Sequence, residues 1–521
     1  MGTYFNPQNG SFKQAVRSKI YVDKTMLLNE LNDVLFTEGK CIALSHARRF
    51  GKSQAAGMID AYYSKGSDSR ELFSPFKITE VDGWDEHLNK YNVIHLDIAS
   101  VADFHKDDLV EEAIRRVYRE MALEYPSIDY TQSINVVISQ IYELTGSPFV
   151  IIIDEWDCVI RNHADRPDLV HRYLQFLHSM FKSEESKSFL ALAYITGILP
   201  VKKIKDESAL NNFQEYTMVD SDILAEYYGF TEDEVRTLCE TYGMDFDTSK
   251  QWYNGYLING RHMYNPNSVC KAMTRHKYES YWKGTSSFET INDLICLNYD
   301  GLKDDIMTIV KGGRVPVNVK LFKNDLTEIH SKDDAMTALI HLGYLGYDAE
   351  RGKAYMPNYE VSEAFALALQ TGKWTEIART LNNCDKLLMA TIDMDTDKVA
   401  ECLELAHETY TSILKYNDEN SLACAITMAY FTAPAYYAGI RELPSGKGFA
   451  DIALIPRSNA GFRPAMIVEL KWDKSADTAI RQIREKRYTG ALQGYDKEIL
   501  LVAINYDRET KHHECVIESI Q

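Results

Sequence analysis

The sequence predicts an α/β protein with more than one domain. In the first third, short apolar runs alternate with segments of helical spacing, and these runs are Cys41–Ser45, Val93–Ile98, Phe149–Asp154 and Phe189–Thr196. Continuous apolar runs of this length are typical of strands covered on both faces, so we expect a largely parallel sheet flanked by helices. A length of 521 residues also exceeds what one hydrophobic core supports.

Helices connect the predicted strands. We expect one from Lys52 to about Tyr63, and others over Asp108–Tyr125 and His171–Lys182, because their apolar residues recur at helical spacing. From residue 220 to 386 the pattern becomes mostly helical, with aromatic clusters at 251–256 and 264–266. Trp252, Tyr253 and Tyr256 could stack bases, but aromatic residues at this spacing usually fill a core, so we assign them a structural role. Without a clear linker to mark boundaries, we predict domains over residues 1–219, 220–386 and 387–521.

A second, compact α/β unit is predicted near the C-terminus. Its elements are the strands Phe449–Ile455 and Ala465–Lys471, joined by a turn at 456–461, then a helix over Ala476–Tyr488 and a strand over Glu498–Ile504. The weakly polar run Ala423–Ile440 precedes them. Because two threonines and Pro434 interrupt this run, we interpret it as a buried helix and not as a membrane span.

Composition and charge exclude several classes of protein. Hydrophobic residues make up 45% of the chain and charged residues 26%, as in folded proteins. The formal net charge of −19 argues against a surface that coats nucleic acid indiscriminately, so such binding would need a local groove. Nine cysteines without a C-x-x-C pair, and no visible secretory signal, predict reduced thiols in a cytoplasmic protein that does not bind membranes.

The segment His46–Ser53 follows the first predicted strand and precedes a predicted helix. A helix N-terminus, a lysine and a hydroxyl together suit a phosphate, so this segment predicts a P-loop in which Lys52 meets the β/γ-phosphates and Ser53 binds Mg²⁺. His46 stands where the usual pattern has glycine, and the alternative is an ordinary helix start with an exposed lysine. The other residues predicted to bind the nucleotide are Arg49, Phe50 and Gly51.

Asp154 and Glu155 end the apolar strand that begins at Phe149. The strand would deliver Asp154 to the magnesium shell and place Glu155 to polarise an attacking water, while Thr196 could contact the γ-phosphate from another strand end. The alternative is that the two carboxylates only cap the next helix. Together with the P-loop, they predict a site that binds and hydrolyses ATP.

Asp451, Glu469 and Lys471 form a third motif on the predicted C-terminal strands. Because side chains alternate along a strand, Glu469 and Lys471 share one face, and an adjacent antiparallel strand can bring Asp451 alongside. Two carboxylates would hold Mg²⁺ or Mn²⁺, and Lys471 would orient the attacking water or neutralise the transition state. The alternative is a solvated hairpin face that carries a Glu-Lys pair.

Taken together, motifs along nearly the whole chain resemble the prokaryotic AAA-ATPase-like family that carries a C-terminal PD-(D/E)XK nuclease domain. These motifs are Tyr21–Thr25, Arg48–Ser53, Ile153–Asp157, Tyr228–Thr231, Trp252–Tyr256 and Tyr264–Pro266. The resemblance implies an AAA-like P-loop fold for 1–219 and a restriction-endonuclease-like fold for 387–521. It also adds the Leu470 carbonyl as a metal ligand. Members usually have Arg-Pro where this chain has His46-Ala47.

Weaker candidates surround the C-terminal motif. Gln482 could touch the substrate or a metal-bound water, Glu419 resembles the acidic residue on the preceding helix of such nucleases, and His512-His513 is expected to face solvent. The basic helix residues could contact phosphates or form a solvated face. These residues are Arg481, Arg484, Lys486 and Arg487.

Two hypotheses follow for the function. In the first, ATP binding gates a metal-dependent nuclease that acts on DNA or RNA. In the second, the chain is a nucleotide-dependent switch or scaffold whose nuclease-like domain binds nucleic acid or a protein partner without cleavage. The acidic net charge favours the second, and the complete carboxylate and lysine set favours the first.

Overall fold

The computed structural model describes most of the chain. The described residues are 2–102, 108–163, 165–201, 210–282, 301–310, 312–320, 329–371, 375–410, 437–445, 448–456, 463–485, 498–510 and 512–520, together with Leu294, Tyr299, Phe322, Ile426, Tyr430 and Ala433. They form two compact units. The first comprises Met1–Tyr281 and Asn298–Asn358, and the second comprises Trp282–Leu297 and Tyr359–Gln521.

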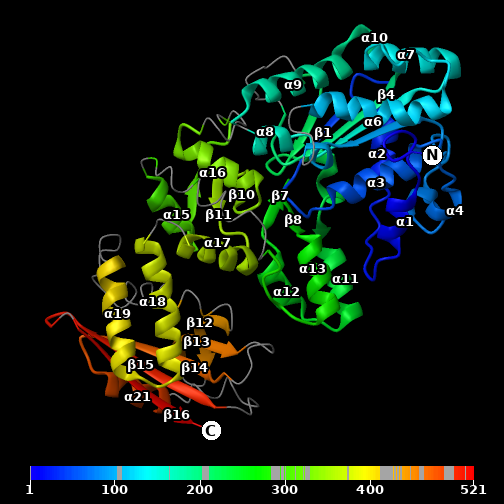
Figure 1. The fold of residues 1–521 in the computed structure, drawn as a ribbon. Helices are drawn as coiled ribbons and strands as arrows, with labels where there is room; N and C mark the ends of the chain where they lie inside the picture. Colours follow the sequence, from blue (N-terminus) through cyan, green and yellow to red (C-terminus); the bar gives the residue numbers. More distant parts are fainter. Residues whose placement is uncertain are drawn as a thin grey trace. The chain divides into compact units, whose positions relative to one another are not determined.

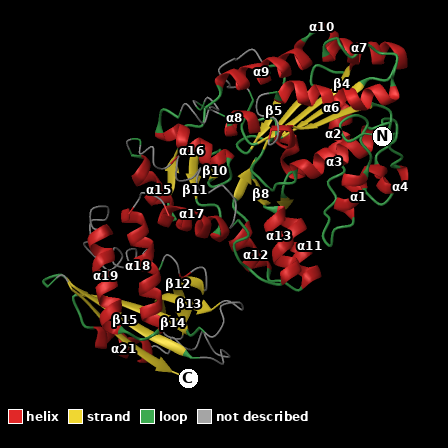
Figure 2. Ribbon diagram, in the orientation of Figure 1, coloured by secondary structure: helices red, strands yellow, loops and turns green. Residues whose placement is uncertain are grey.

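A five-stranded parallel sheet forms the centre of the first unit, in the order β2-β3-β4-β1-β5. Figure 2 shows strands of this sheet with helices around them. Its strands are β1 Cys41–Ser45, β2 Asn92–Asp97, β3 Phe149–Asp154, β4 Leu190–Gly197 and β5 Gln214–Thr217. The four predicted strands are confirmed to within one residue. We did not predict β5, because it is an edge strand whose first residues are polar and partly exposed.

Helices cover both faces of this sheet (Figure 1). One face packs against α1 Gly10–Val16, α2 Leu27–Val34 and α3 Lys52–Tyr63, and the other against α6 Leu109–Glu124, α7 Ile134–Thr145 and α9 Pro167–Lys182. The three predicted helices are confirmed, although α9 begins earlier because Pro167 is its first residue. The short elements are α4 Arg70–Phe73, α5 Ile98–Ala102, α8 Cys158–Asn162, α10 Glu184–Phe189, and the 3₁₀ turns Lys77–Glu80 and Asp222–Tyr227.

The rest of the first unit is helical, as predicted, but also contains two small antiparallel sheets. The helices are α11 Glu232–Tyr242, α12 Phe246–Tyr253, α13 Pro266–Arg275, α15 Leu302–Val310 and α16 Lys332–His341. One sheet has the order β6-β8-β7 and the other the order β10-β11-β9. Their strands are β6 Phe230–Thr231, β7 Tyr256–Ile258, β8 Arg261–Tyr264, β9 Arg314–Pro316, β10 Gly346–Asp348 and β11 Lys353–Tyr355. Strands this short show no readable alternation.

The predicted middle region contributes to both units, since 220–281 and 298–358 lie in the first and 359–386 in the second. The division into domains at residues 219 and 386 stays a prediction. Side chains cap several helix starts in this region: for example, Thr231 and Glu234 form a capping box at α11, and the Asn265 side chain accepts from the Ser268 backbone at α13. No helix in the described part of the chain is both long and apolar enough to cross a membrane.

The second unit contains a mixed five-stranded sheet in the order β12-β13-β14-β15-β16, in which only β14 and β15 are parallel. Its elements are α17 Tyr359–Thr371, α18 Thr375–Ile392, α19 Thr396–Tyr410, β12 Tyr437–Ser445, β13 Gly448–Pro456, β14 Ala465–Trp472, α21 Ala476–Glu485, β15 Ile499–Asp507 and β16 His512–Ile520. Helices α18 and α19 pack on one face of the sheet and α21 on the other (Figure 1).

Three predicted strands and one predicted helix of this unit are confirmed by β13, β14, β15 and α21. The prediction of a buried helix through Ile440 is wrong at its end, because Tyr437–Ile440 belong to β12, where pairing with β13 satisfies the backbone. His513 is also not solvent-facing as predicted, since it is 7% exposed beneath Tyr506. The turn at 456–461 lies almost wholly outside the described residues.

Candidate functional site

A pocket of about 650 Å³ opens where β1 ends and α3 begins. Six residues predicted to form the nucleotide site line it together, and they are Arg49, Phe50, Gly51, Lys52, Ser53 and Glu155. Gly197, the last residue of β4, and Ile198, which follows it, also line the pocket. The carboxyl ends of neighbouring parallel strands meet at one edge of a sheet, which is why residues so far apart in sequence converge here.

The loop before α3 has the backbone geometry of an anion site. Gly51 is the N-cap of α3 with φ 93°, a left-handed conformation that glycine adopts without strain. Arg49 also has a positive φ of 71°. The first N–H groups of a helix have no partner within the helix, and because Gly51, Lys52 and Ser53 line the pocket, this helix start suits a phosphate.

His46 explains why this loop tolerates a residue other than glycine at its start. It is not among the residues with positive φ, so the position makes no demand for glycine. Its ring is fully buried, and Nε2 lies 2.5 Å from Ser221 Oγ. Because the Ser221 hydroxyl donates to the Thr217 carbonyl, His46 Nε2 is the donor. Burial, with a smaller effect of Lys52, lowers the pKa of His46 to about 3, so the ring stays neutral.

Lys52 is folded against its own loop. Its Nζ atom donates to the carbonyl oxygens of His46 at 2.7 Å and of Ala47 at 2.9 Å. Burial lowers the pKa of Lys52 to about 8, although the charges of Asp154 and Asp157 oppose this shift. The lysine is therefore a partly desolvated cation at the base of the pocket.

Asp154 does not line the pocket but stands behind it at the end of β3. It is 6% exposed, and its Oδ1 accepts from the Thr196 hydroxyl and from the Glu155 N–H at 3.0 Å. The predicted contact of Thr196 with a phosphate stays a prediction, while its observed role is to hold this carboxylate. The donor set available to a magnesium ion on this side is the hydroxyl of Ser53 and the oxygens of Asp154, which suits a hard cation.

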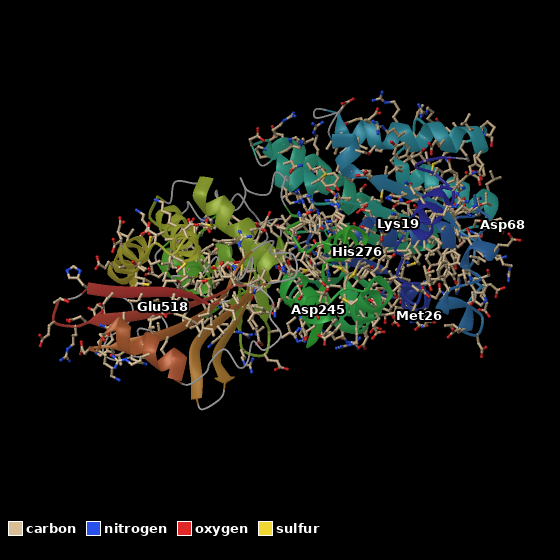
Figure 3. All side chains as sticks on the ribbon, turned by 90° about the horizontal axis from the view of Figure 1, so that it is seen from below. Lys19, Met26, Asp68, Asp245, His276 and Glu518 are labelled. Carbon is tan, nitrogen blue, oxygen red and sulfur yellow. The ribbon has the colours of Figure 1, made fainter. Side chains whose placement is uncertain are left out.

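Further cations of the pocket escaped the sequence analysis. In addition to Arg49 and Lys52, the lining cations are Lys19, Lys24, Arg48 and Lys271, so six positive side chains face one carboxylate, Glu155. Figure 3 labels Lys19 on the first unit. Lys24 also donates to Glu234 Oε1 at 2.7 Å. Only Lys24 and Arg48 stood within motifs quoted above, because the other two lie on elements with no phosphate-binding pattern.

The C-terminal motif lies on β14, on the face that carries α21. Val468 and Leu470 pack with α18 and α19, whereas Ile467, which alternates with them, packs with α21, so the predicted alternation is confirmed. Glu469 and Lys471 are 1% and 5% exposed. Lys471 Nζ donates to Glu469 Oε1 at 2.9 Å and to the Leu470 carbonyl at 3.0 Å. Lys471 thus contacts both Glu469 and Leu470 in a buried environment.

The strand register determines where Asp451 enters this motif. Strands β13 and β14 are antiparallel, as predicted, with Ile452 opposite Val468. Asp451 precedes the first of these residues and Glu469 follows the second, so the two backbone positions are next in register. The Asp451 side chain lies outside the described residues. In the part of the chain that is described, no three His, Cys, Asp or Glu residues are grouped to hold a metal ion.

The weaker candidates are mostly not placed. The Gln482 and Arg484 side chains, and Glu419, Lys486 and Arg487, lie outside the described residues, while Arg481 on α21 is exposed. His512 Nδ1 lies 2.7 Å from Glu404 Oε1 on α19.

Comparison with known proteins gives two family matches. Residues 11–205 match the family described as "Predicted AAA-ATPase", and residues 417–515 match the PD-(D/E)XK nuclease superfamily. A relative from Azotobacter chroococcum mcd 1, described as "Uncharacterized protein in vnfD 5'region", is 22% identical over 512 residues, which cover 94% of this chain and 93% of the relative.

Two solved structures from Aeropyrum pernix also align with the chain. The ORC2 protein, in ADPNP-ADP complexes, is 9% identical with a TM-score of 0.29 and covers 70% of this chain and 98% of its own. The ORC1 protein, in complex with DNA, is 12% identical with a TM-score of 0.25 and covers 72% and 99%.

Proposed function

The chain belongs to the predicted AAA-ATPase-like family and carries a C-terminal domain of the PD-(D/E)XK nuclease superfamily, and on this premise we propose that it is an ATP-regulated, metal-dependent nuclease. ATP binds in the pocket around Gly51, Lys52 and Ser53. Cleavage of DNA or RNA takes place at Asp451, Glu469 and Lys471.

The charge of the pocket carries the nucleotide proposal. The whole chain has a net charge of −19, yet six cationic side chains line the pocket beside one carboxylate, and Glu234, which pairs with Lys24, offsets one of them. Concentrating like charges in a partly buried cleft is unfavourable unless an anion of high charge occupies it. A triphosphate matches this demand, and the N-terminus of α3 supplies the N–H donors.

Each residue of the pocket then has a role in ATP binding and hydrolysis. Lys52 would exchange its loop carbonyls for the β- and γ-phosphate oxygens. Ser53 and Asp154 would hold Mg²⁺, which would neutralise charge on the phosphates. Glu155, at the pocket wall, accepts a proton from the attacking water or polarises it.

The nuclease proposal rests on Glu469, Leu470 and Lys471, which are buried on β14. Glu469, the Leu470 carbonyl and Asp451 would hold Mg²⁺ or Mn²⁺, which lowers the pKa of a bound water and stabilises the scissile phosphate. Lys471, now paired with Glu469, would orient that water or neutralise the transition state. A cation and a carboxylate this deeply buried are costly to maintain, which favours a functional role.

Contacts of Arg49 support regulation by the nucleotide. Arg49 Nη1 donates to the carbonyl oxygen of Tyr281 at 2.7 Å, and Tyr281 is the last residue before the chain passes into the second unit at Trp282. The Tyr281 ring also lies under Arg275 of α13 at 5.4 Å, and Lys271 of the same helix lines the pocket. A phosphate that attracts Arg49 would therefore act on Tyr281, the residue at which the chain leaves the first unit.

Phe50 is connected to the second point where the chain leaves the first unit. The contacts run through the Asn254-Gly255-Tyr256 motif. The rings of Phe50 and Tyr256 meet edge to face at 5.1 Å. Asn358 Nδ2 donates to the Asn254 carbonyl at 2.7 Å, and Asn358 is the last residue before the chain enters the second unit again. Two adjacent P-loop residues, Arg49 and Phe50, are thus connected through contacts to both points where the chain passes from the first unit to the second. Coupling between the two units requires such a physical connection.

One experiment tests the nuclease. Labelled single- and double-stranded DNA and RNA are incubated with Mg²⁺ or Mn²⁺, with and without ATP. We expect cleavage that a chelator abolishes, that Asp451→Ala abolishes, and that Lys52→Ala uncouples from ATP. Glu509→Gln, at an exposed carboxylate between β15 and β16, is the matched control and should cut normally.

A scaffold without cleavage remains the second candidate, favoured by the net charge of −19 and by the engagement of Glu469 with Lys471. It predicts ATP-dependent binding of nucleic acid or of a protein partner that Asp451→Ala leaves intact. Absence of metal-dependent cleavage of all four substrates, with ATP binding retained, would favour it over the nuclease.

A further inference from the structure

We infer that a basic surface beside the nucleotide pocket binds the phosphate backbone of a nucleic acid. The surface, called the basic rim below, is formed by Lys13, Arg17, Lys19 and Arg48. The inference deepens the proposed function and rests on it, because it names a second contact, on the first unit, for the nucleic acid that the C-terminal domain is proposed to cut. Contacts of this kind hold the backbone without reading the base sequence.

Segments of the chain that lack Asp and Glu meet at the pocket. They are residues 1–22, 39–59 and 248–278. The first segment contributes Lys19 to the pocket lining and the second contributes Arg48. In a chain with a net charge of −19, this local absence of carboxylates leaves positive charge uncompensated around one pocket.

The basic rim extends from helix α1 to the pocket. Lys13 and Arg17 lie one turn apart at the end of α1, where the Arg17 N–H donates to the Lys13 carbonyl at 3.1 Å. Helix α1 packs closely on the P-loop helix α3, since a Cβ on Gly57 would lie 2.6 Å from Ser11 Oγ. Lys19 follows α1 and lines the pocket. The rim is therefore held on the same helix pair that begins at the P-loop.

The side chains of the rim are exposed and carry uncompensated charge. Among the residues that the structure describes, none of the four rim cations forms an ion pair with a carboxylate. Elsewhere on the first unit, exposed cations such as Arg70, Arg115 and Lys187 do pair with carboxylates. An exposed cation without a local partner keeps its charge available for an anion that a ligand brings.

Bound ATP does not account for the whole rim. In the pocket, Mg²⁺ would offset part of the triphosphate charge, and Lys52 and the N-terminus of α3 would meet the rest. Lys13 and Arg17 do not line the pocket. Their charge lies outside the volume that a nucleotide would fill, and it therefore suits a ligand that extends along the surface.

The chemistry of the rim favours a nucleic acid over an acidic protein. Protein interfaces are anchored by large apolar or aromatic side chains. Residues 10–22 and 46–53, which the structure describes in full, expose no large apolar side chain. Phosphate contacts need only cations and N–H donors, and both segments carry these groups. The rim is the local basic surface that nucleic-acid binding by so acidic a chain requires.

Binding of a nucleic acid to the full chain tests the inference. Fluorescence anisotropy of labelled single- and double-stranded oligonucleotides of mixed sequence is measured in the presence of a chelator, so that no metal-dependent cleavage takes place. In the paired variant Lys13→Glu with Arg17→Glu, we expect affinity to fall about tenfold or more. The slope of log affinity against log salt should become shallower by about 1–2. Binding of a fluorescent ATP analogue should stay within about twofold, because neither residue lines the pocket.

Lys90→Glu with Arg119→Glu is the matched control, because it changes the net charge equally at two exposed positions of the first unit. Lys90 precedes β2 at the amino end of the sheet, and Arg119 lies on α6, on the opposite face from α1. This control should bind oligonucleotides within about twofold of the wild type. Lys13→Gln with Arg17→Gln removes the charges without reversing them and should have intermediate affinity, which keeps the test valid if charge reversal disturbs α1.

Several results would overturn the inference. A wild type that binds no oligonucleotide, or α1 variants with wild-type affinity and salt slope, would exclude the rim as the contact. An equal loss in the control would assign the effect to overall charge. Poly-glutamate that binds as tightly as the oligonucleotides, and through the same residues, would assign the rim to an acidic protein. A wild type that binds through the rim but cuts nothing retains this inference and overturns the proposed cleavage.

Discussion

The Nζ atom of Lys52 lies 2.7 Å from the carbonyl oxygen of His46. We propose that Lys52 exchanges this contact for a phosphate oxygen of ATP. Burial brings the pKa of Lys52 to about 8, so the lysine is charged below that pH and loses its proton above it. Affinity for ATP should therefore be constant below pH 7 and fall as the pH rises through 8, by up to about tenfold per unit.

Titration of a fluorescent ATP analogue between pH 6.5 and 9.5 checks this expectation. Lys52→Arg keeps its charge over the whole range and is the matched control, so its affinity should not follow the same decline. A wild-type affinity that stays level up to pH 9.5 would contradict the assignment of Lys52 to the phosphate.

Replacement of His46 should destabilise the first unit. The ring is fully buried, donates to Ser221 and packs 5.5 Å from the Tyr228 ring, so His46→Gly leaves a cavity and removes the donor to the Ser221 hydroxyl. We expect the free energy of unfolding to fall by about 2–4 kcal/mol, and by about 1–2 kcal/mol in Ser221→Ala, which loses the hydrogen bonds of the hydroxyl with His46 and the Thr217 carbonyl but opens no large cavity. Urea unfolding followed by circular dichroism measures both. Equal stability of His46→Gly and the wild type would show that the usual glycine fits this loop.

His95 on β2 should make stability depend on pH. Its Nδ1 lies 2.6 Å from Asp60 Oδ2 on α3. Burial disfavours the charged ring, but the charge of Asp60 and its hydrogen bond outweigh burial and raise the pKa from 6.5 to about 9. A raised pKa in the folded state contributes stability that is complete below pH 6.5 and lost as the pH rises through 9.

The expected loss between these limits is about 3 kcal/mol, measured as the difference in unfolding free energy between the wild type and His95→Gln at each pH. Taking the difference cancels groups of opposite slope, such as Lys52. The difference should shrink steadily from pH 6.5 to 9.5. A difference that is independent of pH would mean that His95 is neutral in the folded protein.

Gly255 should be required for contact between the aromatic motif and the segment that leads into the second unit. A Cβ at this position would lie 1.8 Å from the Pro357 carbonyl oxygen, and the backbone has a φ of 114°. Gly255→Ala should therefore cost more than about 2 kcal/mol and weaken the ATP dependence of cleavage. Gly260→Ala, with a φ of 74° and open space around it, is the matched control and should cost about 1 kcal/mol with normal ATP dependence. Equal effects of the two variants would contradict a role for the Pro357 contact.

Much of the fold could be predicted from the sequence, because the patterns that predict it are local. The four apolar runs of the first sheet, the helix from Lys52 to Tyr63 and the strand carrying Glu469 all follow from the period of apolar residues. Edge strand β5 and the two small sheets could not be predicted from the sequence. Their stability comes from pairing with distant segments and not from the pattern of apolar residues within each strand.

The sequence by itself determined which chemical groups the protein possesses: a helix start with Lys52 and Ser53, carboxylates at the end of a buried strand, and Glu469 and Lys471 on one strand face. Only the tertiary structure decided how Lys52 is used, since the burial that lowers its pKa and the cations Lys19 and Lys271 that line the same pocket come from separate elements, whereas the carbonyls that hold it belong to its own loop. Periodicity reports which residues are apolar, whereas convergence at a pocket depends on strand order, which no local pattern encodes.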